Sequence, residues 1–381
     1  MNISIGRKQA VVTPFRVAAI FVLILGLYVT FLRFWGGLGR VTNLSDTFPW
    51  GIWIAFDVLC GVALAAGGFT MTAMAYIMGI DRYRSIVRPS VLTAFLGYLL
   101  VVAGLMFDLG RPWQIWHPVV MWNPHSVMFE VAWCVMLYTI VLAIEFSPIV
   151  FEKFGWYRPT RLYESISIVF VMLGVLLSTL HQSSLGSLFL IIPEKVHPLW
   201  WSQLLPVLFF VSAIMAGFAM VIFESYMSSR AFKQSLERYL VVDLSRFLFI
   251  TLILFLAIRI QDLISRGALG YLFVNKMETY FFWIEQLLFI IPIYALSRPE
   301  RRINERAIFW SATSVVIGLV VNRFNVSITA VIAMSGIEYY PSVYEVFTSL
   351  FLITFGVVIF WLAAKYLPIF RHGKQLSMAK G

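Results

Sequence analysis

The sequence predicts an all-α integral membrane protein with about ten transmembrane helices, and three observations support this prediction. Of the 381 residues, 60% are hydrophobic and only 13% are charged, which is about half the charge of an average soluble domain. Apolar stretches of about 20 residues, long enough to cross the hydrocarbon core of a bilayer, recur along the whole chain. Lysine and arginine also gather on alternate connections between these stretches.

The ten apolar stretches define the predicted helices and their grouping. Glu130 and Glu285 each lie near the start of a helix, the fourth and the eighth, and this weak internal repeat predicts two four-helix bundles with one flanking helix on each side. We treat residues 1–381 as a single polytopic membrane domain, with its longest loops at 183–202, 228–243 and 323–342. The predicted helices span roughly residues 16–35, 50–78, 88–108, 126–150, 163–190, 203–227, 244–264, 279–297, 306–322 and 343–368, so that the bundles cover 50–190 and 203–322.

The net charge of +10 follows the topology rather than indicating a nucleic-acid partner. With the N-terminus on side one, 21 lysine and arginine residues fall on that side and seven on the other, and Arg259 inside a helix completes the 29. The positive-inside rule then places both termini in the cytoplasm. The seven residues assigned to side two are Arg33, Arg40, Arg111, Lys195, Arg266, Lys276 and Arg323.

The first apolar stretch and the cysteines exclude two other classes of protein. "RFWGGLGR" follows the first stretch in place of a small-residue cleavage site, which favours an uncleaved anchor over a signal peptide. Cys60 and Cys134 both lie in apolar segments, 74 residues apart, and do not form a disulfide framework, zinc motif or iron–sulfur motif. Any iron–sulfur cluster is therefore expected in a partner.

Ionisable residues inside the predicted helices mark the candidate site. Each such group costs about 2.5–3.5 kcal/mol or more in a bilayer, so it usually faces a cavity, a partner or a ligand. Five of them are expected at similar depth near side two, on four consecutive helices: Asp57, Asp108, Arg111, Glu130 and His181. The stretch "STLHQSSLGSL", residues 178–188, adds the polar side chains of Gln182, Ser183, Ser184 and Ser187.

These residue types suit a quinone, which has two carbonyl oxygens and takes up two protons on reduction. A histidine can bond one carbonyl, and histidine and carboxylate pairs can relay protons. We expect Glu130, His181 and Asp108 to act in catalysis, and Asp57, Arg111, Gln182 and Ser184 to assist His181 in binding. Three further glutamates could carry protons from the cytoplasm: Glu145, Glu224 and Glu285.

Structural interpretations stand beside these functional ones. His181 could be a structural histidine, Asp108 and Arg111 could form an ion pair, and Glu145 and Glu224 could lie in the membrane interface. Arg259 could pair with Asp262 or Glu285 to stabilise the bundle. A bis-histidine haem needs two ligands at matched depth, but only one of the five histidines, His181, lies clearly within a helix. We therefore predict no haem and no redox metal in this chain.

Six motifs, in order and spacing, resemble the NrfD or polysulfide-reductase type of membrane subunit, and most of all its ten-helix, HybB-type branch. They are "FPWGIWIAFD", "HSVMFE", "MLYTIVLAIEFSP", "HQSSLGSL", "KVHPLW" and "FWIEQLL". The resemblance implies a quinone site near the periplasmic face, where the subunit meets a ferredoxin-like iron–sulfur protein. It also implies two four-helix bundles, no haem, and roles for Asp108, Glu130 and His181, with Asp57 close by.

Together these features predict a quinone-reactive membrane anchor of a periplasm-facing respiratory oxidoreductase. Menaquinone is the expected quinone, and the expected catalytic partners are of the [NiFe] hydrogenase or multihaem cytochrome kind. Two alternatives remain open from the sequence, namely a proton-coupled secondary transporter and a passive anchor without a quinone site. The sequence decides neither the direction of electron flow nor the side from which protons come.

Overall fold

The computed structural model describes residues 14–232 and 235–370, and within them ten helical segments are long and apolar enough to cross a membrane. The second segment is composite, built from η2 (Trp53–Cys60), α2 (Gly61–Leu64), α3 (Gly67–Thr72) and η3 (Ala73–Ile77). The others are α1 (Pro14–Gly36), α4 (Arg84–Asp108), α6 (Val127–Phe154), α7 (Tyr157–Ser187), α8 (Leu205–Phe232), α9 (Arg238–Ser265), α10 (Met277–Leu296), α11 (Glu305–Phe324) with η10 (Asn325–Thr329) and α12 (Ala330–Ser335), and α13 (Val343–Tyr366).

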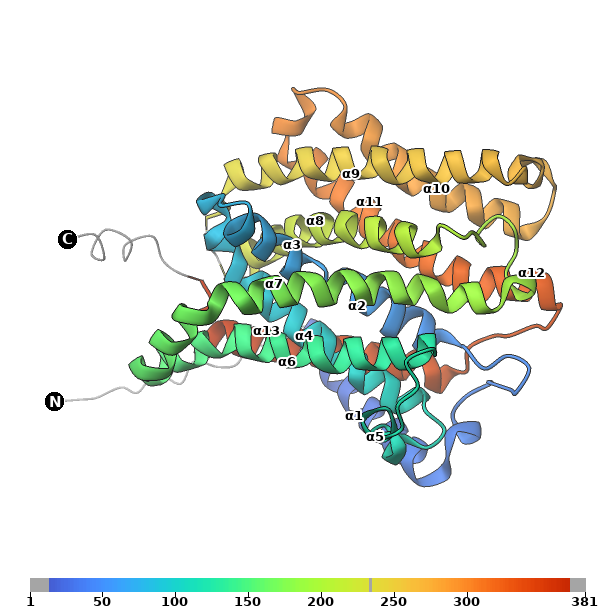
Figure 1. Ribbon diagram of the computed structural model, residues 1–381, viewed down its shortest axis with the longest axis horizontal. Helices are drawn as coiled ribbons and strands as arrows, with labels where there is room; N and C mark the ends of the chain where they lie inside the picture. Colours follow the sequence, from blue (N-terminus) through green and yellow to red (C-terminus); the bar gives the residue numbers. More distant parts are fainter. Residues whose placement is uncertain (1–13, 233–234, 371–381) are drawn as a thin grey trace.

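Short helices complete the connections between the long ones. They are η1 (Leu38–Arg40), η4 (Asp81–Tyr83), η5 (Pro112–Gln114), α5 (His117–Val120), η6 (Leu188–Ile191), η7 (Pro193–Lys195), η8 (Ala268–Phe273) and η9 (Arg301–Ile303). The long helices lie side by side, and α1 begins at the same end of the molecule as that at which α13 ends (Figure 1). We call this end, with the connections 78–83, 154–157, 232–238 and 297–304, the terminal side. The end with connections 37–52, 109–126, 188–204, 266–276 and 336–342 is the opposite side.

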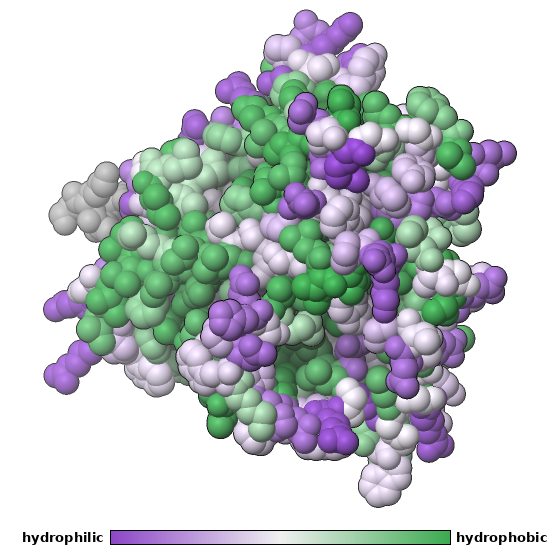
Figure 2. All heavy atoms as spheres, turned by 45° about the vertical axis from the view of Figure 1, so that its right-hand side comes forward, coloured by the Kyte–Doolittle hydropathy of each residue, from purple (hydrophilic) through white to green (hydrophobic). Residues whose placement is uncertain are grey.

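The composite second segment lies at the centre of the molecule and α1 at its edge. Within an 18-residue window, 78% of the second segment is buried, against 11% of α1. The second segment packs on α4, α8 and α11, while α1 packs mainly on α13. Apolar side chains dominate one flank in Figure 2, whereas hydrophilic side chains gather over the end that comes forward. This distribution is that expected of a helical membrane protein.

The other helices pack as two groups that meet along α7 and α8. In the first half of the chain α4 contacts α3 and α6, and α6 contacts α7. In the second half α8 contacts α9 and α11, and α11 contacts α10. The second segment contacts both groups, through α4 on one side and through α8 and α11 on the other, and α13 contacts α4. The division into two four-helix bundles therefore stays a prediction.

The second segment is broken at Ala65 and Ala66. The amide of Ala66 donates to the carbonyl of Ala63, three residues back, rather than to Val62. Close packing accompanies the break, since a Cβ added at Gly68 would lie 2.4 Å from the Cβ of Ala94. Small residues let membrane helices approach closely, and they do so here where the backbone leaves the α-helical pattern.

Several predicted boundaries were wrong because polar residues continue the helices. The expected loop 323–342 is helical as far as Ser335, and the expected loop 228–243 is reduced to the residues between Phe232 and Arg238. Arg33 and Arg323, which were counted among the basic residues of side two, are buried within helices, with 2% and 1% exposure. Six basic residues of the charge count lie outside the described residues: Arg7, Lys8, Lys233, Arg371, Lys374 and Lys380.

Candidate functional site

The polar stretch 178–188 lies on the inward face of α7. Ser178, His181, Gln182 and Leu185 recur with helical spacing, and each is at most 1% exposed. Residues three and four apart share one face of a helix, so this face places three polar side chains inside the protein. These side chains therefore face the interior of the protein and not the lipid.

His181 is fully buried, and only one of its two ring nitrogens has a partner. The Nδ1 atom lies 2.9 Å from the hydroxyl of Tyr98 on α4, while Nε2 has no hydrogen-bond partner among the described residues. A tyrosine hydroxyl can donate or accept, and a neutral imidazole carries a single proton on one of its nitrogens. We assign the tautomer in which Tyr98 donates to Nδ1 and Nε2 carries the proton, because His181 Nδ1 is the one acceptor that the hydrogen bonds of the described residues give the Tyr98 hydroxyl. This leaves a buried N–H donor free.

Tyr98 contacts this histidine, and Tyr138 in turn contacts Tyr98. The ring of Tyr98 packs edge-on against His181, with centroids 5.4 Å apart, and against Tyr138 of α6, with centroids 4.5 Å apart. The Oγ atom of Ser178 and the Oε1 atom of Gln182 are also buried without a partner. Because most buried polar atoms in proteins are hydrogen-bonded, three unpartnered atoms on one helix face indicate a ligand site. We call Tyr98, Tyr138, Ser178, His181 and Gln182 the first-half cluster.

Gln182 and Ser184, both predicted to bind the cofactor, have structural contacts of their own. The Nε2 atom of Gln182 donates to the carbonyl of Val62 at 3.0 Å. This is the carbonyl that the break in the second segment leaves without its helical partner, so Gln182 stabilises the break. The hydroxyl of Ser184 donates to the carbonyl of His181 in its own helix at 3.0 Å, which leaves Ser184 with a local role.

Glu130 does not join the first-half cluster. It lies in the first turn of α6 and is exposed. Tyr138, which contacts Tyr98, follows eight residues later on the same helix, about 12 Å further along its axis. The predicted juxtaposition of Glu130 and His181 at one depth was therefore wrong. The pattern of apolar residues at the start of α6 did not indicate which face of this helix points toward the protein interior.

Asp57 and Asp108 lie near each other, but at a different helix interface from that of His181. Asp57 accepts a hydrogen bond of 2.7 Å from Ser349 of α13 and packs against Gly104 of α4. Asp108 ends α4 beside Arg33 of α1. Both residues thus face the flanking helices rather than α7, and the predicted convergence of four consecutive helices was wrong for them.

Arg33 fixes the end of α4, a role that the sequence did not reveal. Its guanidinium donates to the carbonyls of Phe107 and Leu109 at 2.6 and 2.5 Å. Arg111 is exposed, and the ion pairs found among the described residues do not include one with Asp108. A cation is favourable at a helix C-terminus, and Arg33 supplies one at the end of α4.

The three glutamates predicted for a proton path have different surroundings. Glu145 of α6 faces α7, where a Cβ added at Gly174 would lie 3.0 Å from its Oε1. Glu224 of α8 accepts a hydrogen bond of 2.8 Å from Thr93 and lines a cavity of about 110 Å³ at the terminal side. Glu285 of α10 is fully buried. Glu224 therefore lies beside a cavity, whereas Glu145 and Glu285 are packed between helices.

Glu285 is the centre of a saturated hydrogen-bond network. Four donors reach its two carboxylate oxygens at 2.8–3.0 Å: the side chains of Trp200, Gln286, Asn322 and Asn325. We call these five residues the second-half network. Arg323 extends it, because it donates to Asn322 and Ser212 at 2.8 Å and stacks 3.7 Å above the centroid of Phe209.

The polar run of the second-half network was missed because the ninth helix was predicted to end at residue 322. The letters "NRFN" were available as a signal, but in a sequence they are also typical of a loop. A π-helical stretch over Asn325–Thr329 keeps this run inside the protein.

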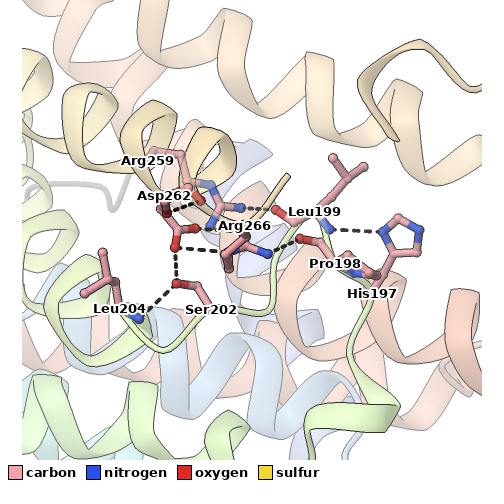
Figure 3. Close-up of polar contacts among 9 residues, drawn as sticks. His197, Pro198, Leu199, Ser202, Leu204, Arg259, Asp262 and Arg266 are labelled. Atoms are coloured by element: carbon pink, nitrogen blue, oxygen red, sulfur yellow. Dashed lines mark hydrogen bonds and ion pairs between the residues drawn. The ribbon is translucent and has the colours of Figure 1, made fainter. Parts of the chain in front are cut away.

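The connection 197–204 is bound to α9 by a separate set of polar contacts (Figure 3). Arg259 donates to the carbonyl of Leu199 at 2.7 Å, and Arg266 donates to that of Pro198 at 2.9 Å. Asp262 forms an ion pair of 2.7 Å with Arg266 and accepts a hydrogen bond from Ser202. The pairing suggested for Arg259 with Asp262 or Glu285 is thus replaced by a pair between Asp262 and Arg266.

Comparison with known proteins agrees with this architecture. The profile of the family described as polysulphide reductase, NrfD, matches residues 40–335. A protein of Nitratidesulfovibrio vulgaris Hildenborough is 38% identical over 95% of this chain and 96% of its own length. The probable Ni/Fe-hydrogenase 2 b-type cytochrome subunit of Escherichia coli K12 is 34% identical, with coverages of 89% and 88%. The integral membrane subunit of menaquinone reductase from N. vulgaris is 27% identical, with coverages of 92% and 90%.

These matches confirm the resemblance found in the motifs, and they extend over nearly the whole chain. With ten apolar helices arranged around a buried polar cluster, the protein is a multi-pass membrane protein that belongs to the NrfD family.

Proposed function

We propose that this protein is the quinone-reactive membrane subunit of a respiratory oxidoreductase, similar to the membrane subunit of hydrogenase 2. It would pass electrons between a partner's iron–sulfur cluster and menaquinone, and would not be catalytic alone. The main supporting observation is the fully buried His181, with Nδ1 bonded to Tyr98 and Nε2 left without a partner. The names of two relatives, a hydrogenase 2 subunit and a menaquinone reductase subunit, point to the same chemistry.

The residues of the first-half cluster fit a quinone head group. The N–H at Nε2 of His181 would hold a carbonyl oxygen, and the free Oε1 of Gln182 and Oγ of Ser178 can accept hydrogen bonds from hydroxyl groups. Tyr98 fixes the tautomer of His181 and orients its ring. A bound quinone would supply two-electron, two-proton chemistry, while the protein supplies a site shielded from water.

The charge distribution supports an orientation of the protein in the membrane, and the relatives support a set of partner subunits. The excess of basic residues on the terminal side supports a bacterial inner-membrane location with both termini in the cytoplasm. The opposite side would then face the periplasm, where a ferredoxin-like iron–sulfur subunit would dock. Catalytic subunits of the [NiFe] hydrogenase or multihaem cytochrome kind would complete the complex.

The experiment is to replace His181 by Gln in the intact complex and to measure quinone reduction by the physiological donor. We expect turnover to fall at least a hundredfold, while donor oxidation by an artificial dye, which bypasses the membrane subunit, stays unchanged. Ser187→Ala is a matched control on the same helix, because its hydroxyl bonds only the carbonyl of Ser183. Normal quinone reduction by the His181→Gln complex would identify a passive anchor instead.

A proton-coupled secondary transporter is the second candidate, and the break at Ala65 and Ala66 is the observation that favours it. Discontinuous helices near the membrane centre are typical of transporters. Affinity purification from native membranes distinguishes the two functions. An oxidoreductase subunit brings iron–sulfur and catalytic proteins with it, whereas a transporter is recovered without them.

We further propose that this chain binds no haem, although a relative is named a b-type cytochrome subunit. A bis-histidine haem needs a second histidine at the depth of His181, and the other described histidines, His117, His125 and His197, lie in connections on the opposite side. Nδ1 of His181 is already bonded to Tyr98, which leaves Nε2 for the quinone. Absence of a Soret band after the subunit is separated from its partners is the expected result.

A further inference from the structure

The start of α7, at the terminal side, carries two arginines without an acidic partner. Arg158 and Arg161 are exposed and lie one helical turn apart. The ion pairs found among the described residues include neither of them. By contrast, Arg82, Arg84 and Arg88, at the connection before α4, each pair with a carboxylate at 2.5–2.9 Å. The two positive charges of α7 are therefore available to an anion from outside the chain.

A surface cavity of about 390 Å³ lies beside these two arginines. Tyr157, Arg158, Arg161, Leu162 and Ser165 line it, and all five are exposed, so the cavity opens to the outside of the protein. Their spacing of three and four residues places them on one face of α7. A volume of this size falls within the range of cavities that hold small organic groups, about 300–1,000 Å³.

An apolar stripe continues from the cavity along the same face of α7. Val169, Met172 and Leu176 follow Ser165 at intervals of four, three and four residues, and each is more than half exposed. Within an 18-residue window of this helix, 17% is buried inside the protein, against 78% for the second segment. In a bilayer this face of α7 therefore contacts acyl chains.

The two arginines lie at the depth of the lipid head groups. The helix α7 has 31 residues and is about 46 Å long, whereas the hydrocarbon core of a bilayer is about 30 Å thick. Val169, the first residue of the apolar stripe, follows Arg161 by eight positions, or about 12 Å along the axis. The first turns of α7 thus extend beyond the acyl chains into the layer that contains the phosphates.

The acids near the cavity leave an excess of positive charge. Glu152, at the end of α6, pairs with Arg88 at 2.5 Å. Glu164 of α7 is exposed but does not line the cavity. Lys153 adds a further cation in the last turn of α6. An anionic group at the cavity therefore meets a positive surface.

We propose that this face of α7 binds an anionic phospholipid from the leaflet at the terminal side. The guanidinium groups of Arg158 and Arg161 hold the phosphate in the cavity, and an acyl chain lies along the apolar stripe. Arginine suits this role because its planar group matches phosphate oxygens bidentately, and basic pockets at the cytoplasmic ends of membrane helices bind such head groups. The lipid site is separate from the first-half cluster, because His181 lies 20 residues after Arg161, about 30 Å further along the helix.

The first experiment identifies the lipid at this face. The intact complex is reconstituted in nanodiscs of phosphatidylcholine that contain a small share of phosphatidylglycerol with a photoactivatable acyl chain. We expect cross-links on the α7 peptide that carries Val169, Met172 and Leu176, and far fewer when phosphatidylcholine carries the same probe. Equal cross-linking by the two lipids would show an apolar contact without head-group selectivity and would overturn the proposal.

The second experiment tests the two arginines. Arg158→Gln and Arg161→Gln should each lower the preference for phosphatidylglycerol at α7 about fivefold, as expected for one basic residue near a membrane surface. Arg246→Gln is the matched control, because it removes an exposed arginine of the terminal side that pairs with Asp243 at 3.8 Å. Size-exclusion elution checks that each variant complex is intact. An equal loss in Arg246→Gln would indicate a general effect of surface charge and would contradict a site at α7.

Salt and a soluble competitor distinguish a lipid from a free phosphate. The preference should weaken as the salt concentration rises, because ions screen exposed charges. Glycerol 3-phosphate, which has the charged group but no acyl chain, should leave the cross-linking unchanged. Displacement of the lipid probe by this compound would assign the cavity to a soluble phosphate instead. Neither outcome affects the proposed function, which the His181→Gln assay tests at the other end of α7.

Discussion

Each half of the chain buries a polar cluster among its helices, and the two clusters differ in how well their hydrogen bonds are satisfied. In the second-half network four donors surround one carboxylate. In the first-half cluster three polar atoms have no partner, namely Nε2 of His181, Oε1 of Gln182 and Oγ of Ser178. A saturated network stabilises helix packing, whereas unpartnered atoms retain the capacity to bind.

The difference has a local cause in the last two helices of each half, α6 and α7 in the first and α10 and α11 in the second. In the second half, the π-helical stretch begins at Asn325, and both Asn325 and Asn322 reach Glu285. In the first half, the helix equivalent to α10 presents Glu130 outward, so no carboxylate meets His181. A histidine without a carboxylate partner stays neutral and free to donate at one nitrogen.

The largest effect is expected from removing the carboxylate of the saturated network. Glu285→Ala leaves four buried donors unpaired and removes the negative charge nearest to Arg323 and Arg259. Breaking a buried charged network in this way costs about 3–5 kcal/mol. We expect a large fall in the thermal midpoint of the detergent-solubilised complex, measured by fluorescence-detected size exclusion.

His181→Gln is the matched change in the first half, and it should shift the same midpoint by far less. The main effect of His181→Gln is expected on turnover, because Nε2 of His181 has no hydrogen bond among the described residues that the substitution would remove. Equal destabilisation by the two substitutions would remove the distinction between a structural and a binding half.

Gln182→Leu tests the structural part of the first-half cluster. It leaves the carbonyl of Val62 buried without the donor that now lies 3.0 Å away, which costs about 1–3 kcal/mol. We expect a lower urea or thermal midpoint for the complex. Ser184→Ala, two residues along, loses only a hydrogen bond within its own helix and should stay near the wild type. An unchanged midpoint in Gln182→Leu would show that the break at Ala65 and Ala66 needs no hydrogen bond from a side chain.

Tyr98→Phe removes the hydroxyl that orients His181 and should cost about 1 kcal/mol of stability. Its larger effect is on turnover, which we expect to fall about tenfold because either tautomer of His181 then becomes available. Ser187→Ala is the control, since its hydroxyl donates to the carbonyl of Ser183 in its own helix. Quinone reduction assays with the intact complex measure both variants, and unchanged turnover in Tyr98→Phe would contradict the assigned tautomer.

Hydropathy was sufficient to predict the ten helices, because a bilayer requires about 20 apolar residues per crossing. It was not sufficient to predict which face of each helix points inward. His181 and Gln182 could be found because polar residues interrupted an apolar run. Glu130 was misplaced because a charged residue at a helix start looks the same whether it faces a cluster or the surface. Arg33 and Arg323 were missed because their partners are distant in the chain.

The smallest effect concerns the connection 197–204 and the pH dependence of stability. Burial lowers the pKa of His197 from its ordinary value near 6.5. Glu278, 3.9 Å away, raises this pKa and Lys276 lowers it, and each of these two effects is smaller than that of burial. Nδ1 of His197 accepts a hydrogen bond from the amide of Leu199 at 3.3 Å, as Figure 3 shows. Protonation at Nδ1 would remove this acceptor, so the folded state holds a neutral imidazole.

Since the folded-state pKa lies below that of the unfolded chain, the unfolded chain binds more protons between the two values. The contribution of His197 to stability is therefore fully present above pH 6.5 and decreases as the pH falls below it, by about 1.4 kcal/mol per unit of pKa difference at most. His197→Gln should make the thermal midpoint less sensitive to pH between 7.5 and 5.5. An unchanged pH profile in this variant would mean that another group of the second half senses acid, and that the connection is bound to α9 independently of His197.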